Sequence, residues 1–424
     1  MSAGEAAPGR SLRGLAGVLS ANVAAWTGTR LLWIALPWFV LSTTGSAAKT
    51  GLVVFAQMGP FVVSQVLSGP LIDRIGPRRV SIVCDLTALV AMSAAPLLYL
   101  ADALSLWTLM ALMAVVGAAD GPSNSAKGVF VPSATRAAKV PLERGTGLVG
   151  AAERTASTVG PAIAGVVVAA FGGIYALWIA AALFGLGALV VATTLHDPKP
   201  EEHEQKVEQV DGYLAQLRQG ATFLRSDGLL RSIIGMVAVT NLLDQAFMAV
   251  LLPVWAKSSG HGPEVIGLIA SVFSAFSIVA SLAAAAYGHR LPRRAVYLIG
   301  FVIGGVPRFA MLALGVPLWA ILVVVAVGGL GSGFINPILG AVQYERIPTP
   351  LLGRVKTLSH ALAWSGIPFG GLVGGALIAL TSLTGALWIV GGCYLVAIVL
   401  PGMRREWSQM NRSADDAEQS AAVP

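Results

Sequence analysis

The sequence predicts an all-α integral membrane protein in which twelve transmembrane helices form two pseudo-symmetric six-helix bundles. Three observations predict this fold class. Of the 424 residues, 55% are hydrophobic and only 12% are charged, whereas soluble domains carry about 25% charged residues. Apolar runs long enough to cross a bilayer recur along the chain. Short motifs of the first half return in the same order in the second half.

The twelve expected spans are apolar runs separated by short polar or charged turns, which cannot lie in hydrocarbon. They cover residues 14–42, 50–72, 80–100, 104–131, 147–171, 175–195, 229–256, 263–288, 295–316, 318–343, 355–380 and 386–403. Tryptophan rings favour the membrane interface, and six of them lie near span ends on one side of the membrane: Trp38, Trp107, Trp178, Trp255, Trp319 and Trp388. The positions of these tryptophans support the expected boundaries of the spans.

Polar segments divide the chain into five parts. These are a tail at 1–13, a bundle at 14–195, a central segment at 196–228, a second bundle at 229–403 and a tail at 404–424. The central segment is too charged to span a membrane, and its amphipathic part, 213–224, is expected to lie along the membrane surface. The first tail carries no signal-peptide pattern, and the second is expected to be disordered.

Basic residues indicate which membrane face each loop occupies. Most of the 28 Lys and Arg residues fall in the tails, the central segment and the loops on one side, whereas only Lys49 and Lys257 lie in loops on the other side. By the positive-inside rule, both termini are cytoplasmic. The net charge of +7 therefore faces anionic lipid headgroups rather than nucleic acid. The abundance of Gly, Ala and Arg indicates a bacterial source, hence a multi-pass protein of the bacterial cytoplasmic (inner) membrane.

Catalytic and cofactor motifs do not emerge from the sequence. Its five His residues are scattered, and Cys84 and Cys393 both fall in apolar spans, so the residues show no metal-ligand spacing. The Gly-rich stretches at 328–333 and 370–375 lack the Gly-Lys-Ser/Thr ending of a phosphate loop. Small residues in spans instead let helices approach closely. We expect neither an enzyme nor an ATP-driven pump, and neither a cofactor nor a metal.

An internal repeat relates the two halves of the chain. At an offset of 216 residues, Leu36-Pro37 matches Leu252-Pro253, Gly51-Leu52 matches Gly267-Leu268, and Asp73-Arg74-Ile75 lies over His289-Arg290-Leu291. After one deletion, Pro77-Arg78-Arg79 matches Pro292-Arg293-Arg294 and Pro122 matches Pro337. The halves are therefore parallel repeats, a plan typical of transporters whose substrate site lies near the membrane midplane between the repeats.

The charged loop between the second and third spans carries the most specific motif. Gly69, Asp73, Arg74, Gly76, Arg78 and Arg79 stand in the order Gly-x-x-x-Asp-Arg-x-Gly-x-Arg-Arg. This motif and the six-plus-six plan resemble the major facilitator superfamily, over nearly the whole chain from about Arg13 to Arg405. Gly160-Pro161 resembles a motif of the family's antiporters, and Leu36-Pro37-Trp38 looks most like the macrolide-efflux and siderophore-exporter branch.

The resemblance implies a central cavity lined by the first, fourth, seventh and tenth spans. Charges inside spans are costly and mark functional positions, and Arg30, Asp120 and Asp244 lie near the middle of the first, fourth and seventh spans. We expect Asp120 or Asp244 to exchange a proton for substrate with Arg30 as a partner, and Glu153 is a secondary candidate. The alternative is that Arg30 forms a permanent structural ion pair with one Asp.

Polar and aromatic side chains share helix faces with these charges through three-to-four-residue spacing. The predicted cavity lining consists of Asn22, Trp26, Trp33, Asn241, Gln245, Asn336 and Trp364. For each Trp the alternative is packing or lipid contact. Arg308, in the ninth span, is interpreted as structural, because it would pair within its own half or extend to the interface.

The resemblance also implies a gate at the charged loop. Asp73 would meet the start of the eleventh span near Arg354, and the loop arginines would meet Asp85 and Glu143 at the cytoplasmic rim, which would close that side. The alternative is a loop with solvated charges that only sets topology. In the second half His289 stands in place of Asp73, which weakens the equivalent latch or makes it sensitive to pH. The favoured alternative is that the repeat has simply degenerated at this position.

Together these features predict a secondary active transporter that exports an amphiphilic small molecule, antibiotic or drug-like, by alternating access and proton antiport. Its partners would be this substrate, protons and membrane lipids, and it would act as a monomer. Two alternatives stay open. One is an importer, or a lipid or siderophore exporter, of the same fold. The other is a non-transporting membrane receptor or scaffold, which would have no need of charges at the midplane.

Overall fold

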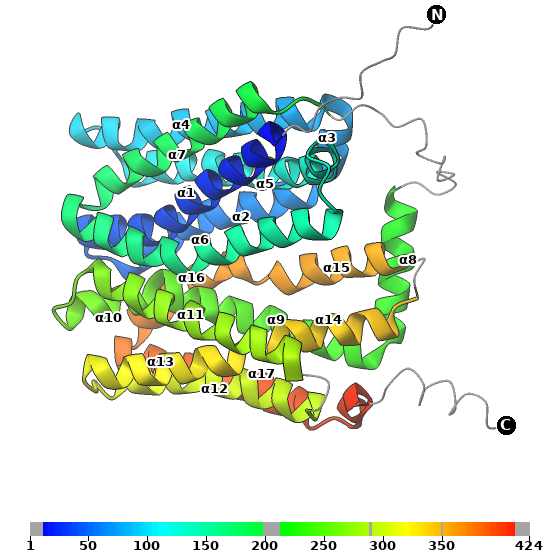
Figure 1. Ribbon diagram of the computed structural model, residues 1–424. Helices are drawn as coiled ribbons and strands as arrows, with labels where there is room; N and C mark the ends of the chain where they lie inside the picture. The colour runs from blue at the N-terminus through cyan, green and yellow to red at the C-terminus, as the bar shows by residue number, and fades with distance from the viewer. Residues whose placement is uncertain (1–11, 198–212, 288–290, 349–350, 412–424) are drawn as a thin grey trace, which may run out of the picture.

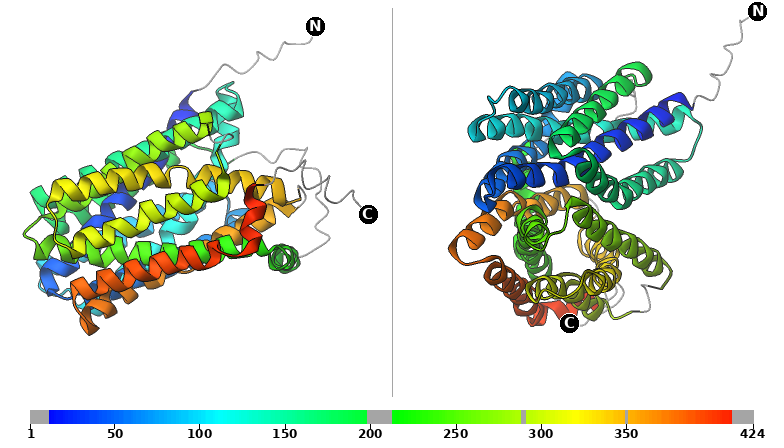
Figure 2. Two further views of the ribbon diagram at one scale, coloured as in Figure 1. Left: turned by 90° about the horizontal axis from the view of Figure 1, so that it is seen from below. Right: turned by 90° about the vertical axis from the view of Figure 1, so that its left-hand side faces the viewer.

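The computed structural model describes residues 12–197, 213–287, 291–348 and 351–411, except for the side chains of residue 143 and residues 213–217. Within these ranges the chain is helical, and 12 helices are long and apolar enough to cross a membrane. The predicted all-α, twelve-span fold class is confirmed. Figure 1 shows the helices running side by side, and the right-hand view in Figure 2 shows them gathered into two bundles.

The first bundle contains α1 (Arg13–Thr44), α2 (Ala47–Val66), α3 (Ser68–Ile75), α4 (Pro77–Leu100), α5 (Leu106–Ala137), α6 (Leu142–Phe171) and α7 (Gly173–Thr194). The second contains α9 (Gly228–Ala246), the π-helical turn η1 (Phe247–Leu251), α10 (Leu252–Ser258), α11 (Pro263–Tyr287), α12 (Arg293–Ala313), α13 (Leu318–Ser332), α14 (Ile335–Arg346), α15 (Leu352–Trp364), α16 (Ile367–Leu380) and α17 (Leu383–Gly402). Two short helices, α8 (Tyr213–Ser226) and η4 (Arg405–Asn411), lie with α3 at one end of the molecule, called here the α8 end.

Proline explains why several predicted spans are broken into two helices. A proline lacks the N–H that would bond to the carbonyl four residues earlier, and its ring clashes with that carbonyl. Accordingly, α2 ends at Val66, four residues before Pro70, and α15 ends at Trp364, four residues before Pro368. The same spacing relates Pro337 to the break between α13 and α14. The predicted span 50–72 is therefore too long by one helix, because α3 begins within it.

Glycines hold the two bundles together at the end opposite α8. A Cβ atom at Gly51 of α2 would collide with the carbonyl oxygen of Gly371 in α16, and one at Gly267 of α11 would collide with the carbonyl of Pro161 in α6. Gly51 and Gly267 are equivalent positions of the sequence repeat. Small residues allow such close backbone approach between spans, so the repeat extends to the contacts between the bundles.

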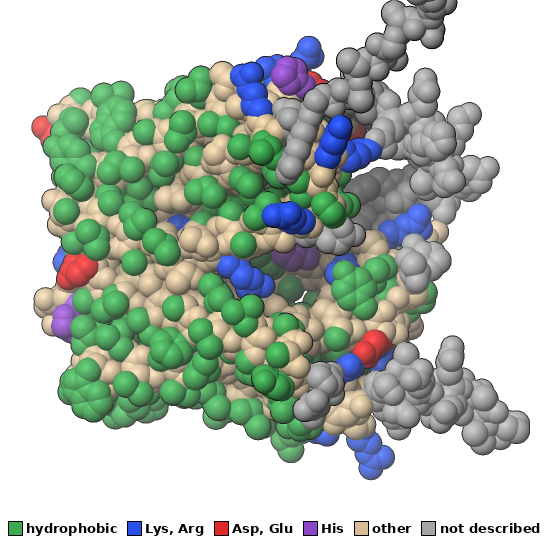
Figure 3. All heavy atoms as spheres, in the orientation of Figure 1, with side chains coloured by type: hydrophobic (Ala, Val, Ile, Leu, Met, Phe, Trp, Pro, Cys, Tyr) green, Lys and Arg blue, Asp and Glu red, His purple; other side chains and the backbone are tan. Residues whose placement is uncertain are grey.

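Near this opposite end a hydrogen bond also joins the bundles. The Nζ of Lys257 donates to the carbonyl of Leu41, at 2.8 Å. Among the hydrogen bonds and ion pairs between described residues, none joins the two bundles at the α8 end. Figure 3 shows the surface hollowed between the bundles toward that end. The molecule is thus closed at the opposite end and open toward α8.

The segment after residue 404 departs from the expectation of a disordered tail over residues 405–411. It forms η4, in which Trp407 is 0% exposed, and the indole N–H donates to the Oγ of Ser232 at 2.9 Å. Gln409 accepts a hydrogen bond from Arg346, whose Nε also pairs with Asp227 at 2.8 Å. This helix could not be predicted from its polar sequence, because its burial depends on contacts with helices that are distant in the chain. The remaining tail positions lie outside the described residues.

Replacing Trp407 by Phe is expected to lower the free energy of unfolding by about 1–2 kcal/mol, because it removes a buried hydrogen bond and leaves a small void. Thermal or denaturant unfolding of the detergent-solubilised protein measures this change. Trp319→Phe is the control, since that indole is 70% exposed on the membrane-facing surface. Equal stability of the two variants would contradict the packing role of η4.

Candidate functional site

A cavity lies between the two bundles, near the middle of the spans. Its volume is about 310 Å³, and its walls come from α1, α2 and α6 on one side and from α9, η1, α11, α12 and α13 on the other. Most of the lining is apolar. Two arginines, one aspartate, two glutamines and two serines interrupt it, which is the mixture expected of a small-molecule site.

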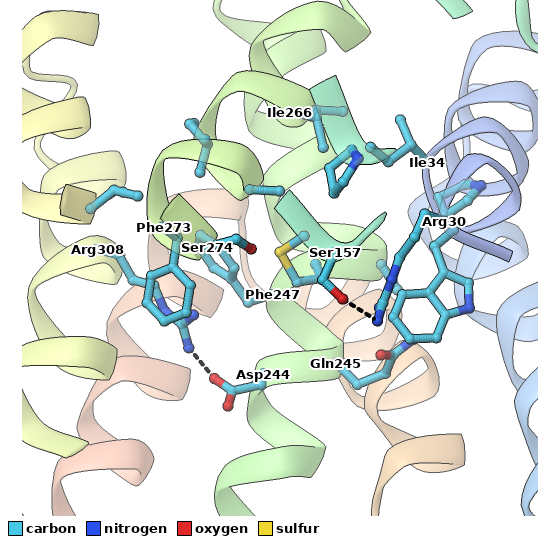
Figure 4. Close-up of a pocket in the computed structure, with 18 of the residues that line it drawn as sticks. Arg30, Ile34, Ser157, Asp244, Gln245, Phe247, Ile266, Phe273, Ser274 and Arg308 are labelled. Carbon is cyan, nitrogen blue, oxygen red and sulfur yellow. Dashed lines mark hydrogen bonds and ion pairs between the residues drawn. The ribbon is translucent and has the colours of Figure 1, made fainter. Parts of the chain in front are cut away.

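On the wall of the first bundle, Arg30 of α1 is the central group. Its Nη2 donates to the Oγ of Ser157 in α6, at 3.0 Å, and its guanidinium lies over the ring of Trp33, 4.5 Å from the centroid. Figure 4 shows Arg30 and Ser157 facing each other at this wall. The guanidinium is thus held at the cavity by a hydroxyl and an aromatic ring.

On the wall of the second bundle, Asp244 of α9 and Arg308 of α12 form an ion pair. The Arg308 side chain is 12% exposed and that of Asp244 is 36% exposed. The guanidinium lies 4.6 Å from the ring centroid of Phe247 and 5.6 Å from that of Tyr394. The Tyr394 hydroxyl donates a long hydrogen bond of 3.5 Å to Asp244. Figure 4 shows this pair across the cavity from Arg30.

The backbone beside Asp244 departs from α-helix. Residues 247–251 form the π-helical turn η1, and Pro253 follows, four residues after Ala249. The missing proline N–H frees a carbonyl within this turn, and π-turns inside helices often mark functional sites. Phe247, Met248 and Ala249 of the turn line the cavity, so the break widens the helix where the cavity passes it.

Asp120 does not line this cavity, although it was expected to. It is 5% exposed and accepts a hydrogen bond of 3.3 Å from the Oγ1 of Thr29, and no residue of α5 is among the lining residues. Asp120 and the exposed Glu153 both act electrostatically on Arg30. The expected cavity with one cation and two anions is therefore corrected to one with Arg30, Arg308 and Asp244 at its walls.

Arg308 is a cavity residue that was expected from the sequence to have only a structural role. The prediction that it pairs within its own half is confirmed by Asp244, but Arg308 also lines the cavity, together with Ile303 and Gly304. The signal that could have found it is the charge itself, because an arginine in the middle of a span needs a partner or a cavity.

The other candidate lining residues divide into two groups. Trp33 and Gln245 line the cavity. The rest serve helix packing or lie elsewhere: Asn22 donates to the carbonyl of Val18, Trp26 donates to Asn124, Asn241 donates to the carbonyl of Ala363, Trp364 stacks near Phe61 and His360, and Asn336 is exposed on α14.

One arginine of the charged motif, Arg78, connects helices within the first bundle. Gly76 takes a left-handed φ of 91° between α3 and α4. The Arg78 side chain donates to the carbonyls of Leu195 and Ala192, at 2.9 and 2.7 Å, and its backbone N–H donates to Asp197 at 3.0 Å. Arg78 therefore caps the end of α7, whereas Asp85 pairs with Lys127 instead. Gly69 and Arg74 lie in α3, and Arg79 lies in the first turn of α4.

Asp85 differs from the expected rim residue because it points into the first bundle. It pairs with Lys127 of α5 at 2.8 Å, both side chains are 1% exposed, and Ser123 bonds to both. The side chain of Glu143 lies outside the described residues, as does His289. This buried pair is structural, since nothing in it reaches the cavity.

Asp73 is exposed and has no ion pair or hydrogen bond with another described residue. Its expected partner region, the start of α15, instead contacts α8, where Arg354 donates to Gln219. The latch between Asp73 and α15 is thus absent from this conformation, which is open toward α8.

Comparisons with known proteins agree with this architecture. The sequence profile of the Major Facilitator Superfamily matches residues 18–243 and 234–406. The multidrug efflux pump Tap of Mycobacterium tuberculosis is 32% identical over 398 residues, which cover 91% of this chain and 93% of that protein. Macrolide efflux protein A of Streptococcus pyogenes is 21% identical over 388 residues, covering 87% and 90%.

Solved structures show the same fold at low sequence identity. The nucleoside transporter NupG superposes with a TM-score of 0.69 at 17% identity, covering 92% of this chain and 98% of that chain. A bacterial homologue of the lysosomal transporter Spinster, in an inward-facing and unoccupied conformation, superposes with a TM-score of 0.71 at 12% identity, covering 95% and 98%.

Proposed function

The chain belongs to the Major Facilitator Superfamily, and from this we propose that it is a secondary transporter that exports an amphiphilic, drug-like molecule by alternating access in exchange for protons. The observation that carries the proposal is the cavity between the bundles, with Arg30 on one wall and the Asp244–Arg308 pair on the other. Efflux as the activity is supported by the multidrug and macrolide exporters among the relatives.

The conformation supports export from the cytoplasm if the α8 end faces inward. Figure 3 shows Lys and Arg side chains gathered mostly toward the α8 end, which is the positive-inside arrangement. The bundles are closed at the opposite end by Gly51, Gly267 and Lys257. A substrate dissolved in the cytoplasm or the inner leaflet would then reach the cavity directly.

Asp244 is the proposed exchange group. Its side chain is partly exposed, and one carboxylate oxygen has only the long hydrogen bond from Tyr394. A positive or hydrogen-bond-donating group of the substrate would bind the ionised carboxylate, and protonation from the outer side would remove that charge and release the substrate. Because proton and substrate compete for one carboxylate, their movements are opposed. Arg30, with Asp120 and Glu153 near it, is proposed to bias this exchange from the other wall.

Everted membrane vesicles test the proposed function directly. With an imposed proton gradient, vesicles containing the protein should accumulate a macrolide antibiotic or a fluorescent amphiphilic dye faster than vesicles without it, and an uncoupler should stop the accumulation. Accumulation that persists after uncoupling would contradict proton antiport. Faster entry into intact cells would favour the importer alternative, and no movement of any probe would favour a receptor or scaffold.

Asp73→Asn is expected to slow transport without changing stability. The side chain is exposed here, so the free energy of unfolding should stay within about 0.5 kcal/mol of the wild type. If Asp73 latches the α8 end in the opposite conformation, its loss favours the open state and reduces turnover while substrate still binds. Asp102→Asn, at an exposed position of the opposite end, is the control. Normal turnover of Asp73→Asn would leave the loop with a topological role alone.

A further inference from the structure

A second hollow lies on the outside of the second bundle, between α12 and α17. It encloses about 350 Å³, and its apolar lining consists of Leu298, Ile299, Val302, Ile398, Val399 and Met403. Ile299 is 55% exposed and Met403 is 73% exposed, so this groove opens onto the surface that a bilayer would cover. Arg294 and Gly402 complete the lining at its α8 end.

Arg294 is held in place at the end of the groove. Its Nη2 donates to the carbonyl of Gly402 at 2.9 Å, and its backbone N–H donates to the Oδ1 of Asn411 at 3.0 Å. The neighbouring Arg293 makes a bidentate ion pair with Glu345, in which Nη1 donates to Oε2 at 2.6 Å and Nη2 donates to Oε1 at 2.8 Å. No described carboxylate pairs with Arg294. Because a guanidinium has five N–H donors, Arg294 keeps donors and a positive charge for a further acceptor.

More positive charge stands at the same end. Arg404 and Arg405 follow Met403 in the chain, both are exposed, and neither forms an ion pair with a described residue. The adjacent acid, Glu406, is turned toward α9, where a Cβ at Gly228 would lie 3.2 Å from its carboxyl group. The groove therefore joins an apolar floor to a cluster of cations.

The first bundle contains a similar arginine cap, but there the arginine backbone N–H donates to a charged group. Arg78 lies one position before the repeat equivalent of Arg294, which is Arg79, yet Arg78 caps the end of α7 as Arg294 caps the end of α17. The acceptor of the Arg78 backbone N–H is the carboxylate of Asp197, whereas the acceptor of the Arg294 backbone N–H is the neutral amide of Asn411. The second bundle thus lacks the internal anion that the first bundle supplies.

We propose that the groove binds an anionic phospholipid. Its phosphate accepts hydrogen bonds from Arg294 and faces Arg404 and Arg405, and one acyl chain fills the apolar groove. The lipid supplies in the second bundle the negative charge that Asp197 supplies in the first. This site is separate from the central cavity and requires neither substrate nor transport.

Native mass spectrometry of the full chain in detergent tests the headgroup, with phosphatidylglycerol and phosphatidylcholine as probes. The wild type should retain phosphatidylglycerol in preference to phosphatidylcholine. Asn411→Asp should lower the affinity for phosphatidylglycerol about fivefold, because the new carboxylate neutralises the site as one charge near the membrane surface. Asp197→Asn, the mirror change in the first bundle, should not lower it. Equal retention of both lipids, or an unaffected Asn411→Asp variant, would overturn the proposal.

A second pair of variants tests the groove itself. Ile299→Trp fills the apolar floor and should reduce phosphatidylglycerol retention, whereas Val83→Trp, on the corresponding helix α4 of the first bundle at a position that is 61% exposed, should not. Phosphatidylglycerol should also raise the unfolding temperature of the wild type through binding to the folded state. Inorganic phosphate should not do so. An equal rise with phosphate alone, or equal retention in both Trp variants, would show that no acyl chain occupies the groove.

Discussion

Replacing Asp244 by Asn is expected to abolish proton-driven transport and to lower the free energy of unfolding by about 2 kcal/mol. Removing one partner of a fully buried ion pair costs about 3–5 kcal/mol, because the remaining charge is left unpaired. Here Arg308 is 12% exposed and Asp244 is 36% exposed, so water reduces the loss. Arg308 would stay among Phe247, Phe309 and Tyr394 without its carboxylate.

A double variant separates coupling from structural support. Asp244→Asn combined with Arg308→Gln removes both charges, so part of the lost stability should return. Transport should not return, because the exchange group is absent. Vesicle transport and chemical unfolding measure the two properties, and Asp102→Asn is again the exposed control. If the double variant regained proton-driven transport, Asp244 and Arg308 would form a purely structural ion pair, and the proposed coupling role of Asp244 would be wrong.

Gly51→Ala is expected to keep the end opposite α8 from closing and to reduce transport at least about tenfold. The added methyl group would collide with the carbonyl oxygen of Gly371, and backbone atoms cannot move aside as a flexible side chain can. Overpacking of this kind costs about 1–3 kcal/mol, and a bias of about 1.4 kcal/mol between two conformations changes their ratio tenfold. The variant should therefore favour the conformation that is open at that end.

The same helix provides a matched control. Gly59→Ala adds the same methyl group to α2 where nothing lies within 4 Å, and it should transport normally. Gly267→Ala, at the repeat-equivalent contact with Pro161, should reproduce the defect of Gly51→Ala. Labelling of Met58→Cys by a membrane-impermeant thiol reagent, with Cys84 and Cys393 replaced by Ser, would report access to the cavity. Equal labelling rates in Gly51→Ala and Gly59→Ala would exclude this closing role.

The spans and the equivalence of the two halves could be predicted because they depend on local composition and on the repeat. Gly51 and Gly267 are matched in sequence and make equivalent contacts in space. Pairings between side chains could not be predicted in the same way. The sequence shows that Arg30, Asp120, Asp244 and Arg308 lie inside spans, but the choice of partner depends on how helices distant in sequence are rotated against each other.

Two residues illustrate this limit. Asp85 lies only a few positions from the charged loop in sequence, yet one further turn of helix carries it into the bundle to Lys127. Trp407 stands in a polar stretch without any periodic pattern, and its burial comes from tertiary contacts with Ser232 of α9 and Tyr297 of α12. In both cases the helix faces are set by tertiary packing, which the linear pattern does not encode.

The contact of η4 also constrains the order in which the protein is assembled during synthesis. Trp407 and Ser232 are 175 positions apart, and domains generally fold from the N-terminus as the chain emerges from the ribosome. The first bundle can complete its packing while the second is still being inserted, whereas the second must wait for the helix that follows its last span. A nascent chain halted before residue 405 would leave Ser232 and Arg346 without their partners in η4. The second bundle would then be incompletely folded and accessible to membrane proteases.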